Sequence, residues 1–257
     1  MVPGRVAPLN PHGNFEYTAD HVWVERNFPT QRAMSYLWTG SDPAEYEVAL
    51  ANLMAKFGRI VDPRDRFELE EPDDWTIEQM ASSPIQMAFF TFLARTAGAK
   101  RILEIGTFVG LGTMQLAGAL PANGLVVSVE KFSVFADIAR RNVERNGFEG
   151  RVSILTGDLL TLVADGSIAA GFDVILLDGG KERYGEFLPI CIDLLAPRGF
   201  IVMDNAFFLG DAVNDEPTTD KGRGVRASLE FARSRDDLEL SFVPFSDGIL
   251  LIRRRDV

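Results

Sequence analysis

Two short apolar runs that end in polar residues constrain the fold of this chain most strongly. FDVILLD spans residues 172–178, and GFIVMDN spans residues 199–205. Both runs are apolar along their length, which is typical of central strands in a parallel sheet that is buried on both faces. If both strands end at the same edge of one sheet, Asp178, Asp204 and Asn205 lie together at that edge.

These side chains could form a reaction site. Two carboxylates and an amide oxygen are the hard ligands that Mg²⁺ or Ca²⁺ prefers, and Lys181 stands three residues after Asp178. The alternative is that both aspartates cap helices or begin turns, as aspartate after a strand often does. Lys181 could likewise be a surface lysine at the start of a helix. Either motif taken alone leaves both interpretations open.

A glycine-rich turn follows an apolar strand within KRILEIGTFVGLGTMQLAGAL, residues 100–120. Gly106, Gly110 and Gly112 let the backbone pass close to a ligand at the carboxyl end of that strand, although such a turn can also need glycine for packing alone. Glu130 ends the next strand and could accept both hydroxyls of a ribose, or be an ordinary acidic loop residue. The pattern indicates a nucleotide-like cofactor, with a glycine spacing that differs from the GxGxxG of NAD-binding proteins.

The rest of the chain alternates helices and strands, which predicts a doubly wound α/β sheet. Asp158 ends the third strand and could reach an adenine amino group or cap the short helix that follows. We expect helices over 43–58, 84–98, 110–119 and 133–146, strands over 101–105, 124–130 and within 151–160, and a closing hairpin from LELSFVPF and DGILLIRR.

The length of 257 residues fits one α/β domain with an N-terminal addition. We expect an arm and a helix over residues 1–75, and the α/β domain over residues 76–257. Residues 1–40 are rich in aromatic side chains, so we expect them to pack on the core or on a partner subunit. Residues 61–75 are acidic and interrupted by prolines, which indicates a loop.

The composition disfavours several classes of binding partner and of active site. The net charge of −11, from 26 basic and 37 acidic residues, disfavours nonspecific binding to nucleic acid or to anionic membranes. No apolar run approaches the ~18 residues of a membrane span, and the chain begins without the pattern of a secretory signal, so we expect a cytoplasmic protein. Cys191, the only cysteine, is expected to be buried and structural. His12 and His21 both fall in the arm, which disfavours a histidine zinc site or a catalytic triad.

With these residues placed, the chain from about Met80 to Arg254 resembles the cation-dependent class I O-methyltransferases, the family of catechol and caffeoyl-CoA O-methyltransferases. LEIGTFVG is similar to the family's S-adenosylmethionine loop, DGGKERY to its metal and lysine motif, and MDN to its second metal motif. MASSP at residues 80–84 resembles its cofactor-covering segment. The resemblance implies a Rossmann-like, seven-stranded sheet, mostly parallel with a C-terminal antiparallel hairpin, and a homodimer.

The resemblance also implies roles for single residues. A divalent cation, Mg²⁺ or another such as Ca²⁺ or Mn²⁺, would lie on Asp178, Asp204 and Asn205, with Lys181 and Asp178 as catalytic residues. The acceptor would be a cation-chelated hydroxyl of a small molecule, either a catechol-like diol or a hydroxyacyl intermediate of secondary metabolism, free or carrier-bound. S-adenosylmethionine would contact Met80, Ser82, Glu104, Gly106, Thr107, Gly110, Gly112, Thr113, Glu130, Asp158 and Asp178.

Some positions depart from the family pattern. Gly112 stands where many members carry a serine that binds the cofactor carboxylate, so this contact is lost or passes to Thr113. Gly179 and Gly180 stand where relatives have larger residues, which implies a thinner wall beside the adenine and the acceptor.

Two other functions compete with methyl transfer. A nicotinamide-dependent reductase would share the sheet, but the dinucleotide glycine spacing is missing, as is the tyrosine and lysine pair four residues apart of short-chain reductases. A noncatalytic protein that still binds S-adenosylmethionine is the other alternative. The presence of Asp178, Lys181, Asp204 and Asn205 together counts against it, because a decayed enzyme need not keep all four.

Overall fold

The computed structural model describes residues 43–255, and the side chains of residues 43–47 are not considered. The chain divides into two compact units, residues 1–59 and residues 60–257, each of which is described by itself. The described part of the first unit is helix α3 (Pro43–Gly58), which begins with a proline, as the first turn of a helix allows. The aromatic arm expected over residues 1–40 lies outside the described residues, and the domain boundary expected near residue 75 stays a prediction.

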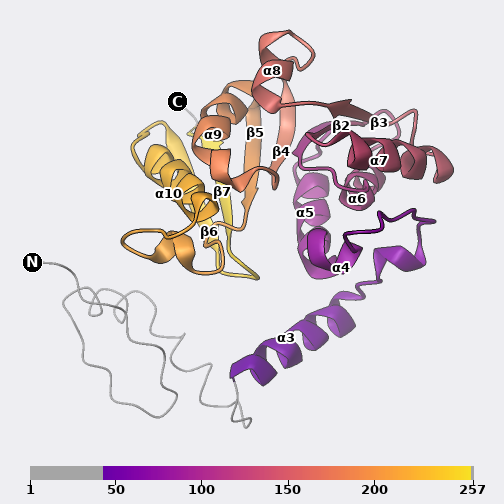
Figure 1. Cartoon of the computed structure of the whole chain (residues 1–257), viewed down its shortest axis with the longest axis horizontal. Helices are drawn as coiled ribbons and strands as arrows, with labels where there is room; N and C mark the ends of the chain where they lie inside the picture. Colours follow the sequence, from indigo (N-terminus) through magenta and orange to yellow (C-terminus); the bar gives the residue numbers. More distant parts are fainter. Residues whose placement is uncertain (1–42, 256–257) are drawn as a thin grey trace, which may run out of the picture. The chain divides into compact units, whose positions relative to one another are not determined.

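The second unit is built on a seven-stranded sheet with the strand order β3-β2-β1-β4-β5-β7-β6 (Figure 1). Strands β1 to β5 pair in parallel, whereas β7 runs antiparallel to both β5 and β6. This arrangement confirms the predicted sheet with its C-terminal hairpin. The strands are β1 (Arg101–Ile105), β2 (Leu125–Glu130), β3 (Val152–Thr156), β4 (Phe172–Leu177), β5 (Leu195–Asp204), β6 (Leu238–Val243) and β7 (Ile249–Arg254).

Helices cover both faces of this sheet (Figure 1). Successive strand residues point to opposite faces, so Ile102 packs with α5, α6 and α7, while Leu103 packs with α8, α9 and α10. The strands are therefore apolar on both sides, as central parallel strands should be. The six helices are α5 (Pro84–Thr96), α6 (Leu111–Ala119), α7 (Ser133–Arg145), α8 (Leu159–Ala164), α9 (Tyr184–Leu194) and α10 (Asp220–Arg233).

Short helical turns lie in the segments between these elements. Helix α4 (Ile77–Met80) precedes α5, and 3₁₀ turns lie at η2 (Pro63–Asp65), η3 (Lys181–Arg183) and η4 (Asp211–Val213). Apart from η2, residues 61–75 contain no regular element, in agreement with the predicted loop. Among the described helices, none is long and apolar enough to cross a membrane.

Two elements differ from expectation. Strand β5 begins at Leu195 rather than Gly199, because Leu195 pairs with Phe172 across a register shift that precedes Val174. Helix α10 was not predicted, since glycines within it weaken the helical signal. The structure explains Gly224, because a Cβ atom there would lie 2.3 Å from the carbonyl oxygen of Lys181. Glycine therefore lets α10 pack directly on η3.

Cys191 lies in α9 and is fully buried. Burial raises the pKa of its thiol well above the ordinary value. A thiol that stays protonated is a poor nucleophile, and the expected burial of Cys191 is confirmed.

Candidate active site

A pocket opens at the carboxyl end of β1, where the strand order reverses between β2 and β4. Open α/β sheets bind ligands at this switch point, outside the carboxyl ends of the strands. One wall is the loop after β1, and the other is the segment that leads into α5. Of the predicted cofactor-binding residues, the pocket is lined by Met80, Ser82, Glu104, Gly106, Thr107, Gly112 and Asp178.

The loops after β1 and β4 pack backbone against backbone. Gly106 adopts a φ of +103°, and a Cβ atom there would lie 2.9 Å from the amide nitrogen of Gly179. A Cβ atom on Gly179 would in turn lie 2.8 Å from the Cα atom of Gly106. Contacts this short exclude a side chain at either position. Gly179 therefore stands against the loop after β1, residues 106–110, called the cofactor loop here because it is predicted to bind the cofactor, and the close packing of the two loops accounts for the small size of Gly179.

Glu104 is a buried carboxylate beneath the pocket. It accepts hydrogen bonds from the hydroxyls of Ser128, at 2.6 Å, and Thr113. Burial raises the pKa of Glu104 to about 7, although both hydroxyls oppose the shift. Thr113 is fully buried and bonds to Glu104 rather than lining the pocket. Gly112 leaves room for Glu104, whose Oε1 would lie 3.2 Å from a Cβ atom at that position.

Glu130 and Asp158 end neighbouring strands, β2 and β3, and both carboxylates have partners. Glu130 accepts hydrogen bonds from the backbone amides of Phe108 and Phe132, each at 2.9 Å, and so ties its strand to the cofactor loop. Asp158 caps α8 by accepting from the amide of Leu160 at 3.0 Å. Its other oxygen pairs with Arg183. Asp158 is thus a helix cap, and its contact with an adenine stays a prediction.

The carboxyl ends of β4 and β5 bring Asp178 and Asp204 to one edge, as the sequence predicts. The buried Tyr184 connects these ends, since its hydroxyl donates to the carbonyl of Leu177 at 2.9 Å and lies 3.5 Å from that of Asp204. Gln86, near the start of α5, donates its amide to both carboxylate oxygens of Asp204, at 3.1 and 3.0 Å. The start of α5 therefore closes this edge of the sheet.

The electrostatics of this edge are dominated by two carboxylates. Burial raises the pKa of Asp204 to about 7, and the charge of Asp178 adds to the shift. Lys181 Nζ donates to the carbonyl of Asp178 at 2.8 Å and to its Oδ1 at 3.0 Å. The hydroxyl of Ser82 lies 3.3 Å from Oδ2 of Asp178. Asp178 thus joins Lys181, the predicted base, to the segment before α5 that lines the pocket.

Asn205 adopts a left-handed backbone with a φ of +53°, a region in which asparagine is enriched. Its amide Nδ2 donates to Oδ2 of Asp247 at 2.9 Å. Asp247 also accepts from the amide of Leu209 at 2.6 Å and so anchors the loop after β5. Because the nitrogen of the Asn205 side chain is used by Asp247, its oxygen is the atom left for a ligand.

The roles of three residues at this edge were not predicted from the sequence: Gln86, Tyr184 and Asp247. Gln86 carries a signal only as part of the helix-capping pair with Ser83. Tyr184 ends the DGGKERY motif, but the sequence assigns it no role of its own. Asp247 is indicated by the sequence only as part of the turn before β7. Each acts on residues far away in the chain, so only the assembled sheet reveals its role.

Among the described residues, no three His, Cys, Asp or Glu side chains gather in an arrangement that could hold a metal ion. The predicted set contains two carboxylates and one amide oxygen, a donor set of hard oxygens that suits Mg²⁺ or Ca²⁺. Its members lie at adjoining strand ends, and two neutral amides, from Gln86 and Asn205, surround Asp204. The residues present are therefore compatible with a hard divalent cation.

A family model described as O-methyltransferase matches residues 68–255. The chain belongs to the O-methyltransferase family. It is 36% identical over 148 residues to a catechol O-methyltransferase of Niastella koreensis, an alignment that covers 56% of this chain and 66% of that one. It is 26% identical over 208 residues to a flavonoid 3',5'-methyltransferase of Vitis vinifera, covering 75% of this chain and 88% of the relative.

A solved structure agrees with this membership. The O-methyltransferase TomG of Streptomyces achromogenes, which is involved in tomaymycin synthesis and was solved in complex with S-adenosylmethionine, is 26% identical with a TM-score of 0.65. The match covers 90% of this chain and 98% of TomG. The O-methyltransferase described here therefore uses S-adenosylmethionine, and the pocket at β1 lies where the fold binds ligands.

Proposed function

We propose that this O-methyltransferase requires a divalent cation and methylates one of two neighbouring oxygens of a small molecule. One observation carries the proposal: Asp178 and Asp204 end adjacent strands beside the cofactor pocket, with the amide oxygen of Asn205 next in the chain. When bound, a divalent cation would lower the pKa of a hydroxyl that it contacts. Asp178, Asp204 and Asn205 would hold it, and Mg²⁺ suits this donor set.

The chain's own residues divide the remaining tasks. Gln86 and the backbone amide of Asn205 orient the carboxylate of Asp204, while Asp247 turns the Asn205 amide so that its oxygen stays available. Lys181 Nζ is held beside Asp178, and as a neutral amine it would accept the proton of the attacking hydroxyl. Positioning of acceptor and cofactor would supply much of the rate.

The acceptor follows from the same donor set. Two neighbouring oxygens can share one cation, so a catechol-like diol is the natural candidate, and the names of two relatives, for a catechol and a flavonoid, agree with it. A hydroxyacyl intermediate, free or carrier-bound, has two oxygens in a comparable arrangement. The likeness to an enzyme of tomaymycin synthesis supports a role in secondary metabolism.

The proposal is tested by removing the cation. With catechol and a panel of hydroxyacyl compounds as acceptors, chelation by EDTA should abolish formation of methylated product, and Mg²⁺ should restore it. Mass spectrometry of the product and calorimetry of Mg²⁺ binding provide independent readouts. Full turnover by rigorously metal-free protein would reject the cation.

Asp204→Ala should abolish cation binding and most of the activity while S-adenosylhomocysteine still binds. Asp165→Ala is the matched control, because it removes the same charge from an exposed position. If Asp204→Ala unfolds the protein, the bond with Gln86 is structural, and Asp204→Asn then separates the loss of charge from the loss of packing.

A further inference from the structure

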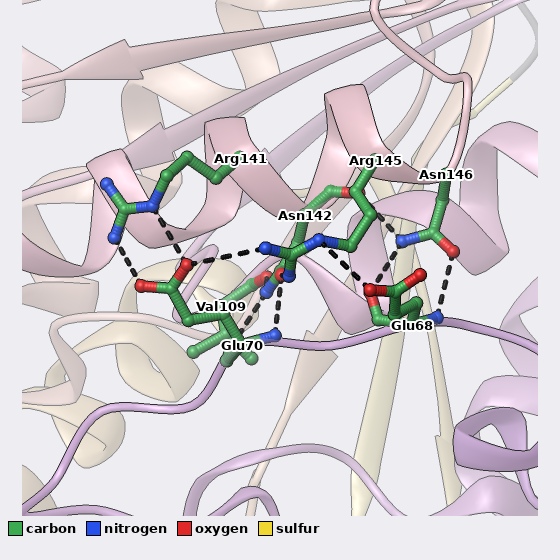
Figure 2. Close-up of polar contacts among 7 residues, drawn as sticks. All are labelled: Glu68, Glu70, Val109, Arg141, Asn142, Arg145 and Asn146. Atoms are coloured by element: carbon green, nitrogen blue, oxygen red, sulfur yellow. Dashed lines mark hydrogen bonds and ion pairs between the residues drawn. The ribbon is translucent and has the colours of Figure 1, made fainter.

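An extended segment, residues 67–71, runs along α7 and is called the strap here (Figure 2). Its apolar side chains, Phe67 and Leu69, pack against a small buried cluster that contains Val109 and Ile77. Its charged side chains alternate with them, so Glu70 meets Arg141 on the outer side. The strap thus has one buried and one solvated side, as a strand has.

Two asparagines of the helix bind the backbone of the strap. Asn142 accepts from the amide of Glu70 at 2.7 Å and donates to its carbonyl at 2.9 Å. Asn146 does the same with Glu68, at 2.9 and 2.8 Å. Each side-chain amide therefore exchanges a pair of hydrogen bonds with one strap residue, as a neighbouring strand would.

The spacing of the two elements permits this double pairing. Four residues of an α-helix rise about 6 Å, and two residues of an extended chain span about 6.6 Å. Asn142 and Asn146 are four residues apart, while Glu70 and Glu68 are two apart. Figure 2 shows the four in register between the helix and the strap.

Asn142 differs from Asn146 in its remaining donor. Nδ2 of Asn142 also donates to the carbonyl of Val109, at 3.0 Å, in the cofactor loop that follows β1. The remaining donor of Asn146 returns to the helix, at the carbonyl of Asn142. Asn142 is completely buried, so both of its donors must be satisfied within the protein.

The two partners of Asn142 lead to opposite walls of the cofactor pocket. Val109 lies in the loop whose neighbours Thr107, Phe108 and Leu111 line one wall. The strap continues through Ile77, whose amide donates to the Glu71 side chain at 3.2 Å, into Met80 and Ser82 of the other wall. One buried side chain outside the pocket therefore joins both walls.

We propose that Asn142 is a positioning residue for S-adenosylmethionine. Its side chain sets the separation between the cofactor loop and the segment that covers this loop. The exposed pair of Arg141 and Glu70 is a weaker candidate for this role, because surface ion pairs contribute little to stability. The proposal rests on cofactor binding alone and does not depend on the proposed cation.

The test compares two isosteric substitutions by calorimetry with S-adenosylhomocysteine, without added cation. Asn142→Asp places a carboxylate oxygen against the carbonyls of Glu70 and Val109, and should weaken binding at least about tenfold. Asn146→Asp makes the same change in a side chain that binds the same strap without touching the cofactor loop, and should change the dissociation constant less than about threefold. Equal effects of both variants, or unchanged binding by Asn142→Asp, would overturn the proposal.

Hydrogen exchange of the unmodified enzyme gives a second readout that needs no variant. Coupling between two sites is reciprocal, so the cofactor product should slow exchange of the Glu70 amide, which bonds to Asn142 outside the pocket. The expected protection is measured at a saturating concentration of S-adenosylhomocysteine. Exchange at Glu70 that is indifferent to S-adenosylhomocysteine would show that Asn142 serves only the fold.

Discussion

Lys181 is the residue on which proton transfer depends in the proposed mechanism. Lys181→Ala should lower the rate by about 10² to 10⁴, the usual contribution of a positioned base. Lys181→Arg should not restore the rate, because a guanidinium stays protonated at any working pH. Steady-state kinetics at saturating cofactor measure the effect, and calorimetry checks that S-adenosylhomocysteine still binds.

Rescue by arginine would assign Lys181 a different role. Its Nζ would then act as a fixed positive charge beside Asp178, and the cation alone would promote ionisation of the hydroxyl.

The remaining rate of Lys181→Ala should rise with pH, as the hydroxyl of the acceptor ionises without a base.

Glu104 gives a prediction about pH. Its pKa of about 7 in the folded protein lies above the ordinary value of 4.5, so the folded state holds the proton more tightly than the unfolded chain. The stability contributed by this group is fully present below pH 4.5, and is lost as the pH rises to about 7. The glutamine side chain of Glu104→Gln does not titrate, so this variant lacks the pH dependence that comes from Glu104. Between pH 4.5 and 8, wild type should therefore lose up to about 3 kcal/mol of unfolding free energy relative to this variant.

Urea unfolding of both proteins across this range measures the difference, and other titrating groups largely cancel because both proteins contain them. A difference that stays constant with pH would mean that Glu104 remains ionised inside the protein. Near-ultraviolet circular dichroism verifies that Glu104→Gln keeps the native packing.

At the scale of elements, the loops after β1 and β4 must approach closely to form the pocket. Gly179→Ala places a methyl group 2.8 Å from the Cα atom of Gly106, so the loops must separate. We expect a loss of about 1 to 3 kcal/mol in unfolding free energy, the cost of overpacking, together with weaker cofactor binding.

Gly118→Ala is the control for this substitution. Gly118 lies inside α6 and a Cβ atom there would meet no atom within 4 Å. Alanine favours a helix over glycine by about 0.5 to 1 kcal/mol, so this variant should be as stable as wild type or more so. If the two variants behave alike in urea unfolding, the approach of the loops is not limiting.

At the level of the whole molecule, the prediction concerns the aromatic arm. Phe15, Tyr17, Trp23, Phe28 and Tyr36 all fall within residues 1–40. We expect so aromatic a segment to pack on the core or on a partner subunit, and the family resemblance implies a homodimer. Deletion of residues 1–40 should therefore weaken acceptor binding or dissociate a dimer. Unchanged kinetics together with unchanged mass in light scattering would refute both roles.

Much of the fold follows from local patterns. Apolar runs such as 172–178 are typical of strands buried on both faces, and glycine stops and helix caps mark most of the helices. Chain order then places the polar strand ends at one edge, because parallel strands joined by helices all end there. Helix α10 escaped prediction because the reason for Gly224 lies in another element, η3.

Local patterns in the sequence were enough to predict the parallel sheet, the glycine turn after β1 and the acidic residues that end β4 and β5. These features depend on periodicity and on residues close in the chain, which local physics can decode. The distant side chains that complete the site are found only in the folded protein. Gln86 reaches Asp204 across 118 positions, and Asn142 reaches Glu70 across 72. Such bonds form only when packing has already brought two elements together, so no local pattern encodes them.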